Sequence, residues 1–394
     1  MSGMILTLNA GSSSIKFALY GGGPDLPREA SGMVEALGSE ARLILTPEGG
    51  AAERRTLGRS DHAGAVQAIL KALAPLLAGR SVDGVGHRIV HGGRDIDGPR
   101  VLSDALLAYL DTLAPLAPLH QPHNLAAVRA ARAAFPDAVQ VGAFDTAFHR
   151  GHPKVNDLFA LPRRFYDMGL RRYGFHGLSY EYIAGVMARD HPRIAKGRVV
   201  VAHLGNGASL CGMENGRSVS STMGFSALEG LCMGTRPGQV DPGVLLYLMK
   251  EEGMGYEDLT RLLYKQSGLL GLSGISHDMR ALLASDAPQA AEAIGYYCTR
   301  LTREIGAMAA VLGGIDALVF TAGVGENAAA IRTMAVERLG FLGLALDETA
   351  NAANERCVGA GPVPVLVLPT DEEAVIARAT GGQTGGHLPQ GPRD

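Results

Sequence analysis

The chain has 394 residues, of which 46% are hydrophobic and 19% are charged, and its formal net charge at pH 7 is −3. This length is enough for two or three domains with a large buried core. Because basic residues are not in excess, the composition argues against nucleic acid and acidic membrane surfaces as partners.

The cysteines and the first residues favour a cytoplasmic protein. The four cysteines form no C-x-x-C pair, and so few thiols in a large chain are typical of reduced, cytosolic proteins. The first residues lack a basic segment ahead of a long apolar run, so we expect no signal peptide. The apolar stretch 305–324 is interrupted by Asp316, and is expected to be a helix end followed by a buried strand, not a membrane span.

Near the N-terminus, two apolar runs flank a polar turn. Residues 5–8 (Ile-Leu-Thr-Leu) and 15–20 (Ile-Lys-Phe-Ala-Leu-Tyr) are predicted strands. Residues 9–14 (Asn-Ala-Gly-Ser-Ser-Ser) form the turn between them. The segment therefore predicts a β-hairpin.

The same design returns near the middle of the chain. Residues 199–204 and 208–213 are predicted strands, joined by Gly205-Asn206-Gly207. Asn-Gly suits the positive φ angles of a tight hairpin turn. Two similar hairpins half a chain apart predict two related α/β domains, one in each half.

Helical periodicity and one more strand follow. Apolar residues at three- and four-residue spacing predict a long amphipathic helix over 287–312, and a shorter helix over 126–134 follows Pro122. Residues 317–320 are a predicted buried strand, and a glycine turn at 321–327 leads from it into another helix.

Breaks in these patterns define the predicted domains. A glycine–proline break places the boundary near residues 148–152. The division is then an N-terminal domain at 1–150 and a C-terminal domain at 151–380. The Gly- and Pro-rich tail at 381–394 is expected to be disordered.

Three predicted turns are suited to phosphate or nucleotide. A glycine turn between strands leaves backbone N–H groups free to point at an anion, and the turn at 9–14 adds serine hydroxyls and is followed by Lys16. The turns at 205–207 and 321–327 add glycines that permit close approach to a nucleotide. No Walker A sequence or protein-kinase motif occurs, so an ATP site would belong to another fold.

Five polar residues lie in apolar or glycine-rich segments, where each alone could be a structural or surface residue. They are Arg88, His120, Asp145, His176 and Arg236. As a set, they supply what phosphoryl transfer needs, namely cations for the spreading negative charge, a carboxylate for a metal and neutral hydrogen-bond donors.

In their order along the chain, these segments resemble the acetate kinase family, within the superfamily of sugar kinases, actin and heat-shock ATPases. The resemblance covers about residues 4–380. It rests on Asn-Ala-Gly-Ser-Ser-Ser-Ile-Lys (9–16), Gly-His-Arg-Ile-Val-His-Gly-Gly (86–93), Phe-Asp-Thr-Ala-Phe-His (144–149), Tyr-Gly-Phe-His-Gly (173–177), His-Leu-Gly-Asn-Gly (203–207), Met-Gly-Thr-Arg (233–236), Gly-Val-Gly-Glu-Asn (323–327) and Thr-Asp-Glu-Glu (370–373).

The resemblance implies a fold and an activity. The fold would be α/β, with two duplicated ribonuclease-H-like domains and the nucleotide site in the cleft between them, in a protein that is typically a homodimer. The activity would be reversible, Mg²⁺-dependent transfer of the ATP γ-phosphoryl group to acetate, giving acetyl phosphate and ADP on a route to acetyl-CoA. Mn²⁺ would be an alternative metal.

The resemblance also implies roles for individual residues. Asn9 and Glu372 would hold the metal, and Arg88 would bind the substrate carboxylate. The catalytic residues would be Asp145, His176, Arg236 and His120. The pocket for the methyl group would be lined by Val90, Leu119, Phe175 and Ala227. The contacts to ATP would be Ser12, Lys16, His203, Leu204, Gly205, Asn206, Gly207, Asp278, Met279, Arg280, Gly323, Val324, Gly325, Glu326 and Asn327.

The chain departs from the usual family pattern in two places. Leu178-Ser179-Tyr180 stands where the family usually has Thr-Ser-His, and Ala227 stands where many members have proline. Alanine would widen the methyl pocket, and one methylene is worth only about 1–3 kcal/mol of discrimination, so we expect propionate turnover. The alternatives are a propionate or butyrate kinase and, in a different class, a non-enzymatic ATP-binding module.

The substrate itself argues against proton transfer. A carboxylate with a pKa near ~4–5 is already ionised at neutral pH, so no base is needed to create the nucleophile. We therefore expect Asp145 to orient Arg88 or a metal-bound water, while Arg88 and Arg236 hold anions that would otherwise repel.

Overall fold

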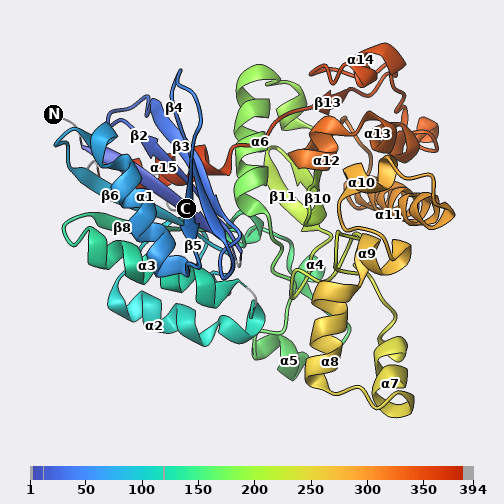
Figure 1. Cartoon of the computed structure of the whole chain (residues 1–394). Helices are drawn as coiled ribbons and strands as arrows, with labels where there is room; N and C mark the ends of the chain where they lie inside the picture. The colour runs from blue at the N-terminus through green and yellow to red at the C-terminus, as the bar shows by residue number, and fades with distance from the viewer. Residues whose placement is uncertain (1–2, 12, 119, 385–394) are drawn as a thin grey trace. The chain divides into compact units, whose positions relative to one another are not determined.

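A computed structural model describes residues 3–11, 13–118 and 120–384 (Figure 1). The chain forms two compact units. Unit 1 comprises the described residues up to Phe148 and again from Asp371, and unit 2 runs from His149 to Thr370. The chain first passes from unit 1 to unit 2 between Phe148 and His149.

Unit 1 is built on an eight-stranded sheet of order β5-β4-β3-β2-β1-β6-β8-β7. Strands β5 to β1 pair antiparallel, whereas β1, β6 and β8 run parallel. The strands are β1 (Met4–Ala10), β2 (Ile15–Tyr20), β3 (Arg28–Glu35), β4 (Ala41–Pro47), β5 (Glu53–Gly58), β6 (Val82–Ile89), β7 (Arg100–Val101) and β8 (Val139–Phe144). The helices are α1 (His62–Leu77), α2 (Asp104–Thr112), α3 (Gln121–Ala134) and α15 (Glu372–Thr384).

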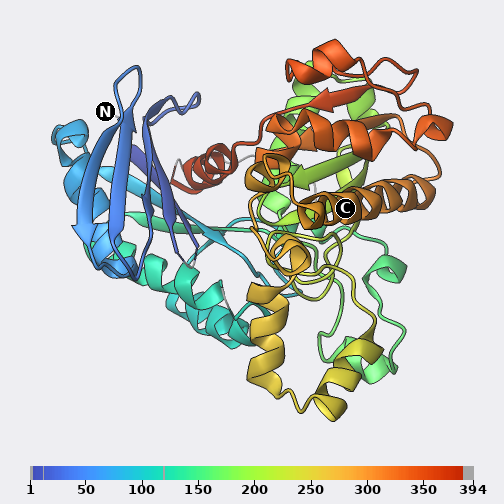
Figure 2. The same cartoon turned by 45° about the vertical axis from the view of Figure 1, so that its right-hand side comes forward.

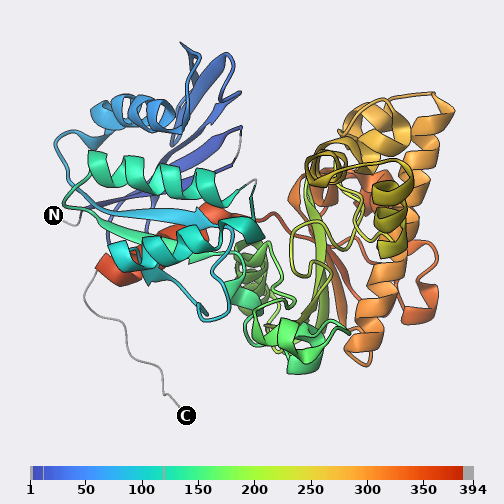
Figure 3. The same ribbon diagram turned by 90° about the horizontal axis from the view of Figure 1, so that it is seen from below.

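Helices cover both faces of this sheet because β1 and β2 are apolar on both faces. Leu6 and Phe17 belong to the core that α1 and α3 complete. Ile5 and Tyr20, which point to the opposite face, pack against Ala377 of α15. Figure 3 shows α1 and α3 on one side of the strands and α15, in red, on the other.

Helix α15 overturns the predicted C-terminal limits. The sequence places residues up to 380 in the second domain and treats 381–394 as a disordered tail. Instead, α15 packs on β1, β6 and β8 of unit 1 (Figure 2), and it continues through residues 381–384. The helix approaches β6 closely because Gly86 has no side chain: a Cβ there would clash with Thr380 and Ile376. Residues 385–394 lie outside the described part of the chain.

Unit 2 repeats the central part of this design. Its sheet has the order β11-β10-β9-β12-β13, with the first three strands antiparallel and β9, β12 and β13 parallel. Strands β3-β2-β1-β6-β8 of unit 1 have the same order and directions. Both predicted hairpins and the duplicated α/β fold are therefore confirmed.

Two helices that the sequence predicts are confirmed, whereas the turn predicted at 321–327 is wrong, as described below. The expected 287–312 helix is α11, which runs along unit 2 (Figure 2), and the expected 126–134 helix lies within α3. The strands of unit 2 are β9 (Arg198–Leu204), β10 (Ala208–Glu214), β11 (Arg217–Ser221), β12 (Ala317–Thr321) and β13 (Val365–Val367). Its helices are α4 (Lys154–Asp157), α5 (Arg163–Asp167), α6 (Gly177–Asp190), α7 (Pro242–Glu251), α8 (Tyr256–Arg261), α9 (Gly268–Ser273), α10 (Met279–Leu283), α11 (Pro288–Val311), α12 (Ala322–Asn327), α13 (Ala329–Val336) and α14 (Glu348–Ala352).

The glycine-rich segment after β12 is the short helix α12 rather than a turn. The carboxylate of Glu326 accepts a hydrogen bond from the backbone N–H of Ala322 at 2.8 Å, at the start of the helix. This side chain satisfies an N–H group that would otherwise lack a partner, which offsets the low helix propensity of the two glycines. Among the helices of the described residues, none has the length and apolar character that crossing a membrane requires.

Candidate active site

Arg88 and Asp145 form a buried ion pair at one edge of the unit 1 sheet. Arg88 lies near the end of β6 and Asp145 follows β8, and the carboxyl ends of these parallel strands meet at the same edge. Arg88 Nε lies 3.1 Å from each carboxylate oxygen of Asp145, and a terminal guanidinium nitrogen lies 2.6 Å from Oδ2. This forked contact fixes the plane of the guanidinium.

The pair is best described as a charged guanidinium with its counter-ion. Burial raises the pKa of the Asp145 carboxyl, and the Arg88 charge opposes that shift. For Arg88, burial acts to lower the pKa, but the carboxylates of Asp145 and Glu372 outweigh it and leave the pKa raised. The side chain of Asp145 is 1% exposed and that of Arg88 is 20% exposed, so Arg88 keeps a face that a ligand can reach.

Asn9, at the end of β1, links this pair to two carboxylates of α15. Its side-chain nitrogen lies 3.2 Å from Glu372 Oε2 and 3.4 Å from Glu373 Oε1. Its side-chain oxygen accepts a hydrogen bond from Arg88 at 3.2 Å. Burial and the neighbouring Glu372 raise the pKa of Glu373, and Lys16 partly offsets that rise. Burial and the neighbouring carboxylate therefore disfavour the charged form of Glu373, whereas Glu372 lies 3.9 Å from Arg88 Nε.

This group fits a magnesium ion in chemistry. Magnesium prefers oxygen ligands and is usually held by one or two carboxylates together with waters and substrate phosphates. Glu372 and Glu373 supply such carboxylates, and an added cation would relieve their mutual repulsion. No cluster of three or more His, Cys, Asp and Glu side chains suited to a metal occurs in the part of the chain that the structure describes, so the phosphates would have to complete the coordination.

Two residues that the sequence analysis did not identify fix the turn after β1. Asn124 of α3 donates to the carbonyl of Ala10 at 2.6 Å and accepts from the backbone N–H of Val90 at 3.0 Å. A ring nitrogen of His62 lies 2.7 Å from the carbonyl of Gly11. Neither residue belongs to a glycine-rich or charged motif, so only the fold reveals them.

The other unit 1 residues of the predicted site have simple positions. His120 lies at the start of α3, Val90 is buried and Lys16 pairs with Asn9 across the hairpin. Ser12 and Leu119 lie outside the described residues.

In unit 2, His176 and Arg236 meet at the turn between β9 and β10. His176 Nδ1 lies 2.8 Å from Ser209 Oγ, and its ring stacks on His203 with centroids 4.2 Å apart. A Cβ atom on Gly207 would lie 2.7 Å from a terminal nitrogen of Arg236 and 3.1 Å from His176 Nε2. Only glycine allows the backbone, the guanidinium and the imidazole to come this close together.

Phe175 and Ala227 are the unit 2 residues that the sequence analysis assigns to a methyl pocket. Phe175 is buried, and its carbonyl oxygen lies 2.9 Å from His149 Nε2. The carbonyl of Ala227 accepts a hydrogen bond from Arg236 at 2.7 Å. Residue 227 therefore orients Arg236 through its backbone, which leaves its side chain free to vary.

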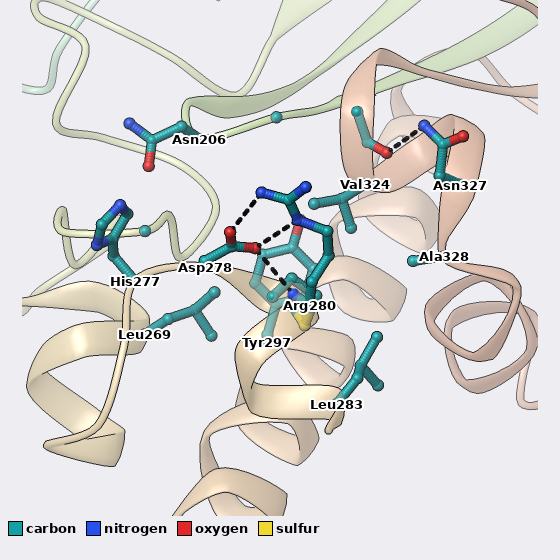
Figure 4. A pocket seen from close by; sticks show the side chains of 14 residues that line it. Asn206, Leu269, His277, Asp278, Arg280, Leu283, Tyr297, Val324, Asn327 and Ala328 are labelled. Atoms are coloured by element: carbon teal, nitrogen blue, oxygen red, sulfur yellow. Dashed lines mark hydrogen bonds and ion pairs between the residues drawn. The ribbon is translucent and has the colours of Figure 1, made fainter. Parts of the chain in front are cut away.

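A cavity of about 550 Å³ opens beside this turn, wholly within unit 2 (Figure 4). This volume is in the usual range of small-molecule sites. Eight of its lining residues are ATP contacts predicted from the sequence: Gly205, Asn206, Asp278, Met279, Arg280, Gly323, Val324 and Asn327. Six others were not predicted: Gly234, Leu269, His277, Leu283, Tyr297 and Ala328.

The other predicted ATP contacts that the structure describes do not line the cavity. His203, Leu204, Gly207 and Gly325 lie in the adjoining turn, strand and helix. Glu326 instead supports α12, since its carboxylate accepts from Ala322 and, at 3.3 Å, from the backbone N–H of Thr370.

These features define a two-unit α/β protein with a small-molecule cavity and paired cationic and carboxylate side chains. The model of the acetokinase family matches residues 4–378. An acetate kinase from Methylocella silvestris is 51% identical over 96% of this chain and 98% of its own length, and one from Nitrobacter hamburgensis is 47% identical over 95% of both chains. The chain belongs to the acetokinase family.

Solved structures with the same fold include kinases of two acids. Porphyromonas gingivalis acetate kinase is 38% identical, with a TM-score of 0.86, over 96% of this chain and 98% of its own. A propionate kinase from Francisella tularensis is 33% identical, with a TM-score of 0.90, over 96% and 99%.

Proposed function

We propose that this protein is an acetate kinase, an enzyme that transfers the γ-phosphoryl group of ATP to acetate and releases acetyl phosphate and ADP. The observation that carries the proposal is the guanidinium group of Arg88. Asp145 fixes its plane, and one face of it remains accessible to a ligand. Relatives named acetate kinase at 42–51% identity over nearly the whole chain support it.

In the proposed reaction, the two units supply different parts of the chemistry. Arg88 binds the acetate carboxylate, and the unit 2 cavity binds the nucleotide. A carboxylate oxygen of acetate forms a bond to the γ-phosphorus while the bond to the ADP oxygen breaks. Arg236 and His176, which meet at the 205–207 turn, neutralise the charge on the phosphoryl oxygens. Asp145 positions Arg88 and moves no proton.

We also propose a Mg²⁺ site at Glu372 and Glu373 near Asn9, with Mn²⁺ as a substitute. When bound, the ion would neutralise phosphate charge. Calorimetry with Mg²⁺ alone should show binding to the wild type and weaker binding to Glu373→Gln, which loses a carboxylate ligand. Equal affinity of both proteins for Mg²⁺ would contradict the site.

Two further properties of the protein are proposals of ours. The apolar residues Val244, Leu246, Tyr247 and Met249 of α7 are 48–67% exposed, and no residue of α7 is buried. Because monomers rarely leave so much apolar surface uncovered, we propose a homodimer through α7, and Leu246→Asp should give monomers in sedimentation. Four free cysteines suit a reducing compartment, which supports the cytoplasm.

A propionate or butyrate kinase is the second candidate. It is favoured by Ala227, which stands where many family members have proline and whose carbonyl accepts a hydrogen bond from Arg236. The similarity to a propionate kinase structure also favours it. In either case the roles of Arg88, Asp145 and Arg236 stay the same.

The deciding experiment measures acyl phosphate formation with ATP and Mg²⁺ from acetate, propionate and butyrate. We expect the highest kcat/KM with acetate and measurable turnover of propionate. A higher kcat/KM with a longer acid would move the assignment to the second candidate. If none of the three acids gives acyl phosphate, the kinase proposal is contradicted and a non-enzymatic ATP-binding module is favoured.

A further inference from the structure

The buried hydroxyl of Tyr180 begins a short chain of hydrogen bonds that ends at His176. Tyr180 lies on α6 and is fully buried. Its hydroxyl oxygen lies 2.5 Å from Ser209 Oγ on β10, and Ser209 Oγ lies 2.8 Å from His176 Nδ1. All three residues belong to unit 2. The phenol of Tyr180 is therefore linked to His176 through one serine.

The directions of these hydrogen bonds follow from the number of hydrogens available. Tyr180 and Ser209 are both buried, and among the described residues their hydroxyls have no hydrogen-bond partners other than each other and His176. A buried hydroxyl hydrogen without an acceptor costs free energy. Only one arrangement gives both hydroxyl hydrogens an acceptor: Tyr180 donates to Ser209, and Ser209 donates to His176 Nδ1.

This arrangement determines which ring nitrogen of His176 carries the proton. Because Nδ1 accepts from Ser209, the proton of the neutral imidazole is on Nε2. Nε2 faces the turn between β9 and β10, where a Cβ atom on Gly207 would lie 3.1 Å from it and 2.7 Å from a terminal nitrogen of Arg236. An N–H group of His176 therefore lies beside the guanidinium of Arg236.

The surroundings of Tyr180 keep its hydroxyl available as a donor. Burial, followed by the neighbouring Cys211, raises the pKa of Tyr180 well above its ordinary value, so the phenol keeps its hydrogen. The ring packs edge-on against His149, with centroids 5.7 Å apart. A phenylalanine ring would fill the same space, so what the hydroxyl adds is the hydrogen bond. The family usually has histidine at position 180, which makes the phenol particular to this chain.

We propose that Tyr180 is a positioning residue that fixes His176 as the neutral tautomer with its proton on Nε2. The proposal rests on the proposed function, in which His176 stabilises the charge on the phosphoryl oxygens. An N–H group on Nε2 donates to such an oxygen, whereas the opposite tautomer would present a lone pair and repel it. Because Tyr180 is fully buried, it acts through Ser209 and not by contact with the substrate.

The first test measures the tautomer itself, by ¹⁵N NMR of ring-labelled histidine at pH 8 without ligand. The signals of His176 are those that disappear in His176→Gln. In the wild type, we expect a protonated Nε2 and an unprotonated Nδ1. In Tyr180→Phe, Ser209 no longer receives a hydrogen and can accept one from His176 instead, so Nδ1 should become partly protonated.

The second test measures acyl phosphate formation. In Tyr180→Phe, kcat should fall by about three- to tenfold, which is the effect of one hydrogen bond. The KM values for acetate and ATP should stay the same, because the charge that His176 stabilises develops in the transition state. Ser209→Ala breaks the chain of hydrogen bonds at its middle, so adding Tyr180→Phe to Ser209→Ala should lower kcat no further.

Tyr182→Phe is the matched control. Tyr182 lies two residues further along α6 and is only partly buried, so the loss of its hydroxyl should change neither the tautomer nor kcat. A wild-type His176 with its proton on Nδ1 would overturn the proposal. So would the wild-type tautomer in Tyr180→Phe, or effects of Tyr180→Phe and Ser209→Ala on kcat that multiply. If the wild type forms no acyl phosphate, the proposed function falls, whereas the NMR measurement still decides whether Tyr180 sets the tautomer.

Discussion

Asp145 is a buried carboxylate whose side chain holds the guanidinium group of Arg88 in place. If Asp145 only positions Arg88, the Asp145→Asn variant still offers Arg88 one hydrogen-bond acceptor. It loses the negative charge and the second acceptor oxygen. We expect kcat/KM for acetate to fall about 10²–10³-fold, as when one donor to a reacting oxyanion is removed. The pKa values of the pH–rate profile should not move. The measurement is kcat/KM from pH 5 to 9.

The control for Asp145→Asn is Asp95→Asn. Asp95 pairs with Arg94 on the surface of the same unit, and its side chain is 71% exposed, so its loss should leave the rate unchanged. A shift of the pKa on the acidic side of the pH–rate profile in Asp145→Asn would show that Asp145 does transfer a proton.

His87, the residue before Arg88, should make the stability of unit 1 depend on pH. It is buried, and a ring nitrogen lies 2.8 Å from Gln140 Oε1. Burial lowers its pKa to about 4, whereas the unfolded chain has the ordinary value of about 6.5. Below pH 6.5 the unfolded chain therefore binds a proton that the folded chain does not, and stability is lost as the pH falls toward 4.

The shift corresponds to about 3 kcal/mol over that range. Urea unfolding followed by circular dichroism at pH 7, 5.5 and 4 should show the loss in the wild type and a flatter dependence in His87→Gln. The same slope in both proteins would assign the acid sensitivity to other groups.

At the scale of elements, the short helix α12 depends on a buried arginine. Arg332 is fully buried and donates to the carbonyls of Gly325 and Glu326, at the end of α12, at 2.9 and 3.1 Å. It also donates to Asn351 and Asn354 near α14 at 2.7 Å. A positive charge at the C-terminus of a helix is favourable, and here it also satisfies carbonyls that lack helical partners.

We predict that Arg332→Met lowers the free energy of unfolding by about 2–4 kcal/mol, because several buried acceptors lose their donor. Since α12 lines the cavity in which we propose that the nucleotide binds, ADP affinity should fall as well. Calorimetric unfolding and binding would measure both. Arg338→Met, which changes an exposed arginine just after α13, should leave both values unchanged. Full stability in Arg332→Met would contradict this role.

The sequence predicted those elements whose signal is local. The hairpins and α11 follow from alternation and helical spacing within one segment, so they could be predicted. Helix α12 could not, because its glycines indicate a turn and the groups that cap it, Glu326 and Arg332, act through contacts. In the same way, Arg88 and Asp145 were candidates from their types, but their mutual contact spans 57 residues of sequence. Tyr297 carried no signal, because a tyrosine on the apolar side of a helix is indistinguishable from a core residue.

At the scale of the whole molecule, the two units differ in how the chain builds them. Unit 2 is one continuous segment, whereas unit 1 needs both the first 148 residues and α15. We predict that a fragment of residues 149–370 folds by itself, with a cooperative thermal transition. A fragment of residues 1–148 should not fold, because β1 and β2 would expose Ile5 and Tyr20, and adding residues 371–384 as a separate peptide should restore it. Cooperative unfolding of 1–148 alone would show that α15 is dispensable.

The position of α15 also has a consequence for synthesis on the ribosome. Domains usually fold in the order in which they are made, but here the first unit to be started is the last to be finished. At about 5–20 residues per second, translation of unit 2 takes roughly tens of seconds. During this time one face of the unit 1 sheet is not covered by α15. The nascent N-terminal sheet is therefore the part of this protein that chaperones have to protect, and a premature stop near codon 370 would release a chain with a finished unit 2 and an uncovered unit 1.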